Sequence, residues 1–305
     1  MAVKRLLMSI VIILAGLFAI DRVGGFVMDR VGRISKDGFS PKFQYIQKEI
    51  DQDVLFLGAS RCEHHYVPGI IADSLGRSVY NVGFGSSDNI YSHYIVLSHI
   101  LERYSPKMIC LEVMPSDYCR QDDPFTFISI FAPLIGKSER ADSVFRLAGT
   151  YWEYQVSHIY RYNARASSNL WGLVLDRQKG NDNGYTPLKE PAVFPSLLSK
   201  EYPDKTVDSL KIEYLDRFAT LCRQNDIKLV FIVSPKYTLV EPSGYEVLKR
   251  IASEHSIPFL DYHTSGLYHD HPEYFKDEGH LWDRGARLFS SVVAQDLKHI
   301  IQCSN

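Results

Sequence analysis

Three polar residues in this sequence could together perform acyl transfer. Ser60 follows an apolar run, and Asp277 and His280 form an Asp-x-x-His pair near the carboxyl terminus. A serine hydroxyl attacks a carbonyl carbon when a base takes its proton, and histidine has the pKa range for that task. An aspartate beside the histidine would orient the imidazole and stabilise the imidazolium. These residue types predict a Ser60 nucleophile, a His280 base and an Asp277 that orients the base.

Two further turns could supply an oxyanion hole. Gly83 and Gly85 lie in one turn and Ser116 in the other, each after a short apolar run. Glycine lets a backbone amide approach a substrate closely, and one oxyanion donor is worth about 3 kcal/mol in known hydrolases. We expect the N–H groups of Ser60 and of Gly83 or Gly85 to bind the oxyanion, with Ser116 as a further donor.

Polar residues near these turns are candidates for substrate contact. Proximity to Ser60 or to a neighbouring turn selects Arg61, His64, His65, Asn89 and Asp117. Structural roles compete with these assignments, because serine and aspartate often cap helices and glycine often serves a plain turn. Glu112 lies inside an apolar run, so its carboxylate must face the pocket or find a partner.

The elements that must position these residues alternate between strand and helix. Short apolar runs predict buried strands at 53–58, 78–82, 107–113, 228–233 and 258–261. Apolar residues at three- and four-residue spacing predict helices at 86–104, 207–225, 243–254 and 284–301, with a serine or aspartate at the start of the first. This alternation predicts an α/β fold with a mainly parallel sheet covered on both faces. In such folds ligands bind at the carboxyl ends of the strands, where Ser60 and the glycine turn lie.

These motifs resemble those of the SGNH (GDSL-type) hydrolase superfamily. Gly58-Ala59-Ser60 stands where the family has Gly-Asp-Ser, Asn81-Val82-Gly83 is similar to its second block, and Asp277 with His280 is similar to its Asp-x-x-His block. The likeness covers residues 51–118 and 204–300. The family's third block supplies an oxyanion asparagine, whereas the turn here reads Pro115-Ser116-Asp117. Ser116 or Asn89 could replace it.

The resemblance implies a three-layer, flavodoxin-like fold and an acyl-serine intermediate. Membrane-tethered members handle acyl or acetyl groups on bacterial envelope polysaccharides, which implies an acylated carbohydrate or other ester as substrate and polysaccharide-modification proteins as partners. Water as acceptor would make the protein an esterase, and a sugar hydroxyl would make it an acyltransferase. The alternative is a catalytically inactive member that binds a glycan or scaffolds an envelope assembly complex.

The amino terminus has the pattern of a membrane anchor. Residues 6–20 are weakly polar to apolar, Lys4 and Arg5 precede them, and 23–28 could extend them to a full span. A cleaved signal peptide and a buried helix are the alternatives. Basic residues before the span would keep the start in the cytoplasm and place the rest, in a single pass, on the extracytoplasmic side of the cytoplasmic membrane.

The remaining chain reads as one body on a tether. We expect an anchor at 1–28, a polar stalk at 29–50 and one hydrolase-like domain at 51–305, which carries a helical, aromatic insertion at about 119–204. The aromatic residues of the insertion either contact sugars or pack against one another; they are Tyr151, Trp152, Tyr154, Tyr160, Tyr162 and Trp171.

Composition argues against several other classes of protein. The chain has 34 basic and 36 acidic residues, so it lacks the basic footprint of a nucleic-acid binder. Five cysteines are too few for a disulfide framework. Histidines and carboxylates cluster at 63–65 and 263–271 without a recognised ligand spacing. We therefore expect neither a metal nor a cofactor.

Overall fold

The chain forms two compact units. The computed structural model describes residues 2–85, 87, 89–174, 182–197, 206–238, 244–266 and 268–303. Residues 49–127 and 179–305 make up one unit, the sheet unit, and residues 1–48 and 128–178 make up the other, the anchor unit.

The sheet unit contains a parallel sheet of five strands in the order β2-β1-β3-β4-β5. The strands are β1 (Val54–Leu57), β2 (Val79–Asn81), β3 (Met108–Glu112), β4 (Lys228–Val233) and β5 (Phe259–Asp261). Every residue of β1, β2 and β3 is buried, as expected for parallel strands covered on both faces. The strand order is that of flavodoxin-like folds. The prediction of an α/β fold with a mainly parallel sheet is confirmed.

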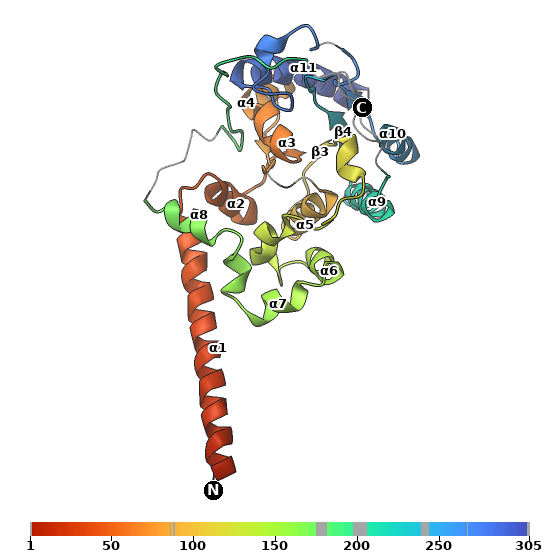
Figure 1. The fold of residues 1–305 in the computed structure, drawn as a ribbon. Coiled ribbons are helices and arrows are strands. Elements are labelled where there is room, and N and C mark those ends of the chain that lie inside the picture. Colours follow the sequence, from red (N-terminus) through yellow and green to blue (C-terminus); the bar gives the residue numbers. More distant parts are fainter. Residues whose placement is uncertain are drawn as a thin grey trace. The chain divides into compact units, whose positions relative to one another are not determined.

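Helices cover both faces of this sheet (Figure 1). One layer consists of α3 (Ser60–His65), α4 (Pro68–Leu75) and α11 (Asp283–Gln302), and α11 packs on the other two. The other layer consists of α5 (Ile90–Ile100), α9 (Ser209–Gln224) and α10 (Tyr245–Glu254). Asn89 caps α5 by accepting the Ser92 N–H, so the expected serine or aspartate cap is corrected to an asparagine. Asp208 caps α9 in the same way.

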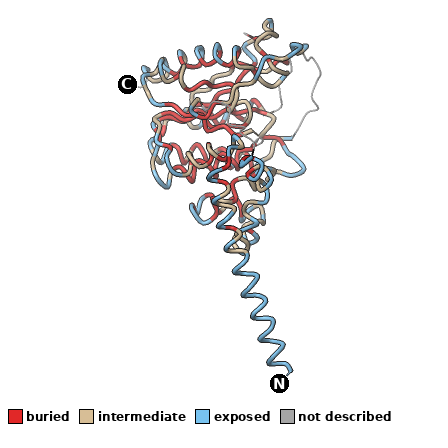
Figure 2. Tube along the Cα trace, turned by 90° about the vertical axis from the view of Figure 1, so that its left-hand side faces the viewer, coloured by how far each residue is buried: buried red, intermediate tan, exposed pale blue. Residues whose placement is uncertain are grey.

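The anchor unit consists of helices. They are α1 (Ala2–Ile34), α2 (Phe39–Lys48), α6 (Glu139–Leu147), α7 (Tyr151–Val156) and α8 (Ala166–Trp171), with 3₁₀ turns at Ile128–Leu134 and Tyr160–Tyr162. Helix α1 is long and apolar enough to cross a membrane. Residues 2–20 are exposed along the whole stretch, as Figure 2 shows, so the buried-helix alternative does not describe them. The apolar helix could serve as a membrane anchor or as a signal sequence.

The predicted stalk and insertion are divided differently in the structure. Residues 29–34 continue α1, and Phe43 and Ile46 of α2 are buried, with the Phe43 ring 6.2 Å from that of Phe131. The stalk region therefore packs with residues 128–178, because its apolar residues recur at helical spacing. Residues 182–197, predicted as part of the insertion, belong to the sheet unit: the Asn81 N–H donates to the Asn183 carbonyl at 2.8 Å.

Candidate active site

Ser60 lies at the tight connection between β1 and α3. A Cβ on Gly58 would lie 2.6 Å from the Cβ atoms of Cys62 and Glu112, so this turn requires glycine. Ser60 is the first residue of α3, and the N-cap position belongs to Ala59, so Ser60 does not cap this helix. Its Oγ instead lies 2.9 Å from Nε2 of His280.

His280 and Asp277 lie in the loop that precedes α11. Nδ1 of His280 lies 2.9 Å from Oδ1 of Asp277, which also accepts the Gly279 N–H at 2.8 Å. An ionised carboxylate only accepts hydrogen bonds, so Nδ1 carries the proton in this arrangement. Nε2 then has its lone pair toward the Ser60 hydroxyl. This is the tautomer that a general base for Ser60 needs.

A buried chain of hydrogen bonds holds this loop against the strand ends. The N–H of Leu281, next to His280, donates to Nε2 of His65 at 2.9 Å. Nδ1 of His65 lies 3.1 Å from the Ser234 hydroxyl, which is 2.7 Å from a carboxylate oxygen of Glu112. Since Nε2 of His65 accepts, its Nδ1–H donates to Ser234, and Ser234 donates to Glu112. We call His65, Ser234 and Glu112 the buried relay.

His65 is fully buried, which corrects the expectation that it contacts substrate. Burial holds the pKa of His65 well below its usual value, and the nearby His280, Arg61 and His64 act in the same direction. The side chain is therefore neutral, as its two hydrogen bonds require. The sequence could not distinguish it from His64, because burial of neighbouring helix residues depends on what packs beside the helix.

Glu112 finds partners rather than facing solvent. Its carboxylate accepts from the Tyr66 hydroxyl, from the Ser234 hydroxyl and from Nε of Arg61, the last at 3.2 Å. Burial raises the pKa of Glu112, while Arg61 and the hydrogen bonds from Tyr66 and Ser234 oppose that rise. The Glu112 carboxylate thus links β3 to α3 through Arg61 and to the end of β4 through Ser234.

The two glycine amides expected in the oxyanion hole already have partners. The Gly83 N–H donates to Oδ1 of Asn81 at 2.9 Å, and the Gly85 N–H donates to Oε2 of Glu63 at 2.8 Å. The expectation for both glycines is therefore corrected: nearby side chains bind these amides, and neither is free for an oxyanion here. The Ser60 amide is in the first turn of α3, where N–H groups lack helical acceptors.

The other predicted site residues divide into near and remote groups. The His64 ring lies 5.9 Å from the His280 ring and its Nδ1 lies 2.7 Å from the Thr186 carbonyl, so His64 flanks the base. Asp117 lies 3.5 Å from Nη2 of Arg61. Ser116 is half-buried in the 3₁₀ turn Pro115–Tyr118, at the carboxyl end of β3.

Asn89 does not serve the site. Its Oδ1 caps α5, and its Nδ2 donates to the Thr126 carbonyl at 2.6 Å. Both polar atoms of the Asn89 side chain are therefore already hydrogen-bonded at the start of α5. This corrects the expectation that Asn89 contacts substrate or replaces the oxyanion asparagine.

Sequence reasoning missed two residues at the end of β4. Ser234 joins the buried relay, and Lys236 lies among Arg61, Asp117 and Glu278. Burial lowers the pKa of Lys236, Arg61 adds to that shift, and Asp117 and Glu278 oppose it. The rule that sites form at strand ends would have selected both residues had it been applied to the fourth strand.

Cysteines and possible metal ligands were also candidates for a second reactive centre. Cys62 and Cys110 are buried, and burial raises the pKa of the Cys110 thiol. Among the described residues, no three histidine, cysteine or acidic side chains form a group able to hold a metal ion. Of the aromatic residues in 151–171, Tyr154 is buried and stacks on Tyr160 at 5.3 Å, whereas Trp152 and Trp171 are exposed.

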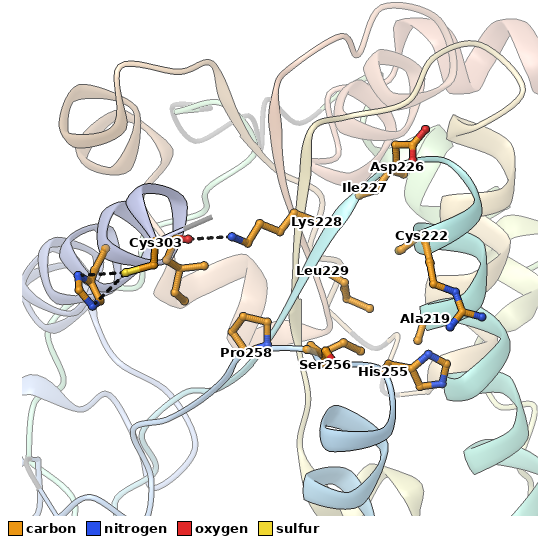
Figure 3. A pocket seen from close by; sticks show the side chains of 14 residues that line it. Ala219, Cys222, Asp226, Ile227, Lys228, Leu229, His255, Ser256, Pro258 and Cys303 are labelled. Atoms are coloured by element: carbon orange, nitrogen blue, oxygen red, sulfur yellow. Dashed lines mark hydrogen bonds between the residues drawn. The ribbon is translucent and has the colours of Figure 1, made fainter. Parts of the chain in front are cut away.

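A hollow of about 720 Å³ lies at the amino-terminal end of β4, whereas Ser60 follows the carboxyl end of β1. Figure 3 shows the side chains that line it. Lys228 and Leu229 at the start of β4 line it, together with the ends of α9 and α11. Lys228 donates to the Ile300 carbonyl and Cys303 contacts His299, whereas the buried Nδ1 of His255 has no hydrogen-bond partner among the described residues. We assign this hollow no part in the chemistry of Ser60.

Comparisons with known proteins leave the family open. No protein-family model matches the chain, and no curated protein matches it. One solved structure to which it is similar is a predicted acylhydrolase of Bacteroides fragilis, at 14% identity and a TM-score of 0.38. That match covers 84% of this chain and 94% of the other. At this TM-score the likeness supports no conclusion about the activity of this chain.

Proposed function

We propose that the protein is a serine-dependent acyl hydrolase with Ser60 as nucleophile, His280 as general base and Asp277 as the residue that orients His280. One observation carries the proposal: Ser60 Oγ lies 2.9 Å from His280 Nε2, and His280 Nδ1 lies 2.9 Å from Asp277 Oδ1. These distances meet the reach required of a nucleophile and its base.

The reaction would proceed in two halves. Ser60 Oγ bonds to the carbonyl carbon of an ester while its proton passes to Nε2 of His280. The bond to the leaving alcohol then breaks, the alcohol takes the proton from His280, and acyl-Ser60 remains. In the second half His280 removes a proton from the acceptor, whose oxygen bonds to the acyl carbon. The bond from that carbon to Ser60 Oγ then breaks, and Ser60 Oγ takes the proton back from His280. Water gives hydrolysis, and a sugar hydroxyl gives acyl transfer.

The oxyanion that forms in each half needs donors. The amide of Ser60 is one candidate, because it lies at the first turn of α3 beside its own hydroxyl. The Ser116 hydroxyl, at the neighbouring strand end, is the second. The amides of Gly83 and Gly85 would serve only if they exchanged their present acceptors.

The proposed substrate is an O-acyl or O-acetyl ester on a cell-envelope polysaccharide. The support is indirect: the motifs resemble those of membrane-tethered SGNH members, and α1 is apolar enough to span a membrane. The sheet unit would then lie on the extracytoplasmic side of the cytoplasmic membrane, where polysaccharide-modification proteins would be its partners.

A catalytically inactive, glycan-binding or scaffolding protein is the second candidate. It is favoured by the hydrogen bonds that occupy the Gly83 and Gly85 amides, since these leave the oxyanion hole short of the expected donors. Each missing donor costs about 3 kcal/mol of transition-state stabilisation in known hydrolases.

Fluorophosphonate labelling distinguishes the two candidates. We expect the detergent-solubilised full-length protein and a Ser291→Ala control to be labelled, because Ser291 is an exposed serine of α11. The Ser60→Ala variant should not be labelled. Labelling that is absent from all three proteins, or equal in all three, would contradict a Ser60 nucleophile. Release of acetate from O-acetylated polysaccharide, measured on the same proteins, tests the substrate class.

A further inference from the structure

Helix α1 changes its surroundings at Asp21. Residues 2–20 are exposed, whereas Asp21 accepts hydrogen bonds from the Ser157 hydroxyl at 2.5 Å and from the N–H groups of His158 and Ile159 at 2.8 and 3.3 Å. Three donors from one segment thus attach the end of the exposed stretch to residues 157–159.

Close helix packing continues beyond this contact. A Cβ on Gly25 would lie 2.9 Å from the carbonyl carbon of His158, so the segment after α7 approaches α1 at a distance that only glycine allows. Arg22 donates to the Val156 carbonyl at 3.3 Å while its guanidinium stacks over the Phe18 ring. Residues 156–159 therefore lie level with Phe18 to Gly25 of α1.

An exposed apolar patch lies at this same level. Trp152 and Val156 are 72% and 71% exposed, and their four-residue spacing puts them on one side of α7. Ile159 and Tyr160 follow, each 40% exposed. We call these four residues the α7 patch. Such a set of large apolar side chains is unusual on a surface that faces only water.

We infer that the α7 patch lies in the interface of the lipid bilayer, beside the point where α1 leaves the hydrocarbon. Residues 6–20 would span about 22 Å as an α-helix, and the long side chains of Lys4 and Arg5 can reach the headgroups at the other end. Asp21 and the segment bound to it would therefore lie near the boundary of a hydrocarbon core of roughly 30 Å. Tryptophan and tyrosine are enriched at this depth because their rings are amphipathic. The inference needs α1 to be a membrane span and is independent of the reaction proposed for Ser60.

Charged side chains of both signs lie beside the patch, as expected near a layer of lipid headgroups. A hollow of about 210 Å³ is lined by Arg22, Arg161, His158 and Asp29, and Arg22 also lies 3.4 Å from Asp21. The guanidinium groups would face the phosphate layer if the patch lies where we place it. A protein partner would not require the patch to coincide with the end of the span.

The chain supplies its own control in Trp171. This side chain is 60% exposed in α8, close to Asn169, which Gly32 of α1 approaches. Gly32 lies about 16 Å beyond Asp21 along the helix axis. Trp171 should therefore lie outside the interface while Trp152 lies in it.

The test uses full-length protein in vesicles of phosphatidylcholine and phosphatidylglycerol, with or without bromine on the acyl chains. Two variants, Trp171→Phe and Trp152→Phe, each keep one exposed tryptophan, and both keep Trp282 as a common background. Brominated lipid should remove about half or more of the fluorescence contributed by Trp152 and little of that contributed by Trp171. Circular dichroism checks that both variants fold.

Two results would overturn the inference. Equal or absent quenching in the two variants would show that Trp152 does not lie at the depth of the lipid chains. Quenching of Trp152 by aqueous acrylamide as strong as that of Trp171 would show that the bilayer leaves the patch uncovered, as a docking surface for protein would be. Neither result depends on whether Ser60 reacts.

Discussion

At the scale of residues, the candidate site depends on how one imidazole is held. Asp277 determines which nitrogen of His280 carries the proton, and Ser60 meets the other nitrogen. Ser60 and His280 are separated by 220 positions along the chain, so only folding brings them within hydrogen-bond reach. The buried relay is part of the same arrangement, because His65 binds the amide next to His280.

Replacing Asp277 by asparagine should reduce ester hydrolysis sharply while the protein stays folded. The amide would still contact Nδ1 but could donate to it, which favours the tautomer with its proton on Nε2, facing Ser60. A known triad loses on the order of 10,000-fold in kcat from this change. Asp270→Asn is the control, since Asp270 is exposed in the same region of the chain. Similar kcat values for the two variants would contradict the role given to Asp277.

Removing the Ser234 hydroxyl should destabilise the sheet unit and lower kcat through His280. Ser234→Ala leaves the buried Nδ1–H of His65 and an oxygen of Glu112 without their shared partner, at a cost of about 1–3 kcal/mol. Urea unfolding and kcat are measured beside Ser291→Ala, which removes an exposed hydroxyl from α11. A Ser234→Ala protein as stable and as active as Ser291→Ala would count against the relay.

At the scale of elements, the candidate site is formed by the loops and turns that connect strands to helices. Ser60 begins α3 after β1, Ser116 follows β3, Ser234 follows β4, and the loop with His280 precedes α11. The connection after β2 contributes differently from expectation, since Gly83 lies against the first turn of α3. A Cβ there would lie 2.5 Å from the Glu63 N and 2.8 Å from the Cys62 carbonyl carbon.

Gly83→Ala should therefore displace α3 and lower both stability and activity. Both contacts are with backbone atoms, which cannot move aside as a side chain tip can, and overpacking of this kind costs about 1–3 kcal/mol. Gly69→Ala is the matched control: a Cβ at that position in α4 meets Asp182 at an ordinary 3.6 Å. Alanine favours a helix interior over glycine by up to about 1 kcal/mol, so this variant should be neutral or slightly more stable. Thermal unfolding measures the stability of both variants. A Gly83→Ala protein as stable as Gly69→Ala would contradict the close approach of Gly83 to the backbone of α3.

At the scale of the whole molecule, acid should destabilise the sheet unit through its buried histidines. Burial lowers the pKa of His93 to about 4 and that of His65 well below its usual value. Above pH 6.5 neither the folded nor the unfolded chain protonates these groups, so they cause no pH dependence. As pH falls from 6.5 toward 4, His93 and His65 bind protons in the unfolded chain but not in the folded chain.

The free energy of unfolding should therefore decrease over that window and level off with respect to His93 below pH 4. The contribution of His93 alone is at most about 3 kcal/mol, from the shift in its pKa. Urea unfolding at pH 7.5, 6, 5 and 4 measures the slope, and His93→Leu should flatten it. An identical slope in the variant would mean that His93 is not protonated on unfolding in this range.

The sequence by itself determined the class of fold and selected Ser60, Asp277 and His280, which the structure brings together. Short apolar runs such as 228–233 predict buried parallel strands, because a strand covered on both faces must exclude water from both. The order of the strands then follows a common topology, and residues after the strands meet at one edge. The fold class and the placing of these residues at one edge of the sheet depend only on local sequence patterns and a general rule of topology, so the sequence alone was enough to predict them.

Only the tertiary structure decided which polar neighbours serve the site. His64 and His65 are adjacent in sequence, yet one flanks His280 and the other is sealed beneath it, because burial depends on what packs against each face of α3. The amides of Gly83 and Gly85 were equally ambiguous, since a hydrogen bond to Asn81 or Glu63 exists only once the turn folds. Residues 29–48 of the predicted stalk and residues 128–178 of the predicted insertion belong to one unit for the same reason. The contacts that join them, such as that of Phe43 with Phe131, involve residues distant in sequence and cannot be predicted from either segment alone.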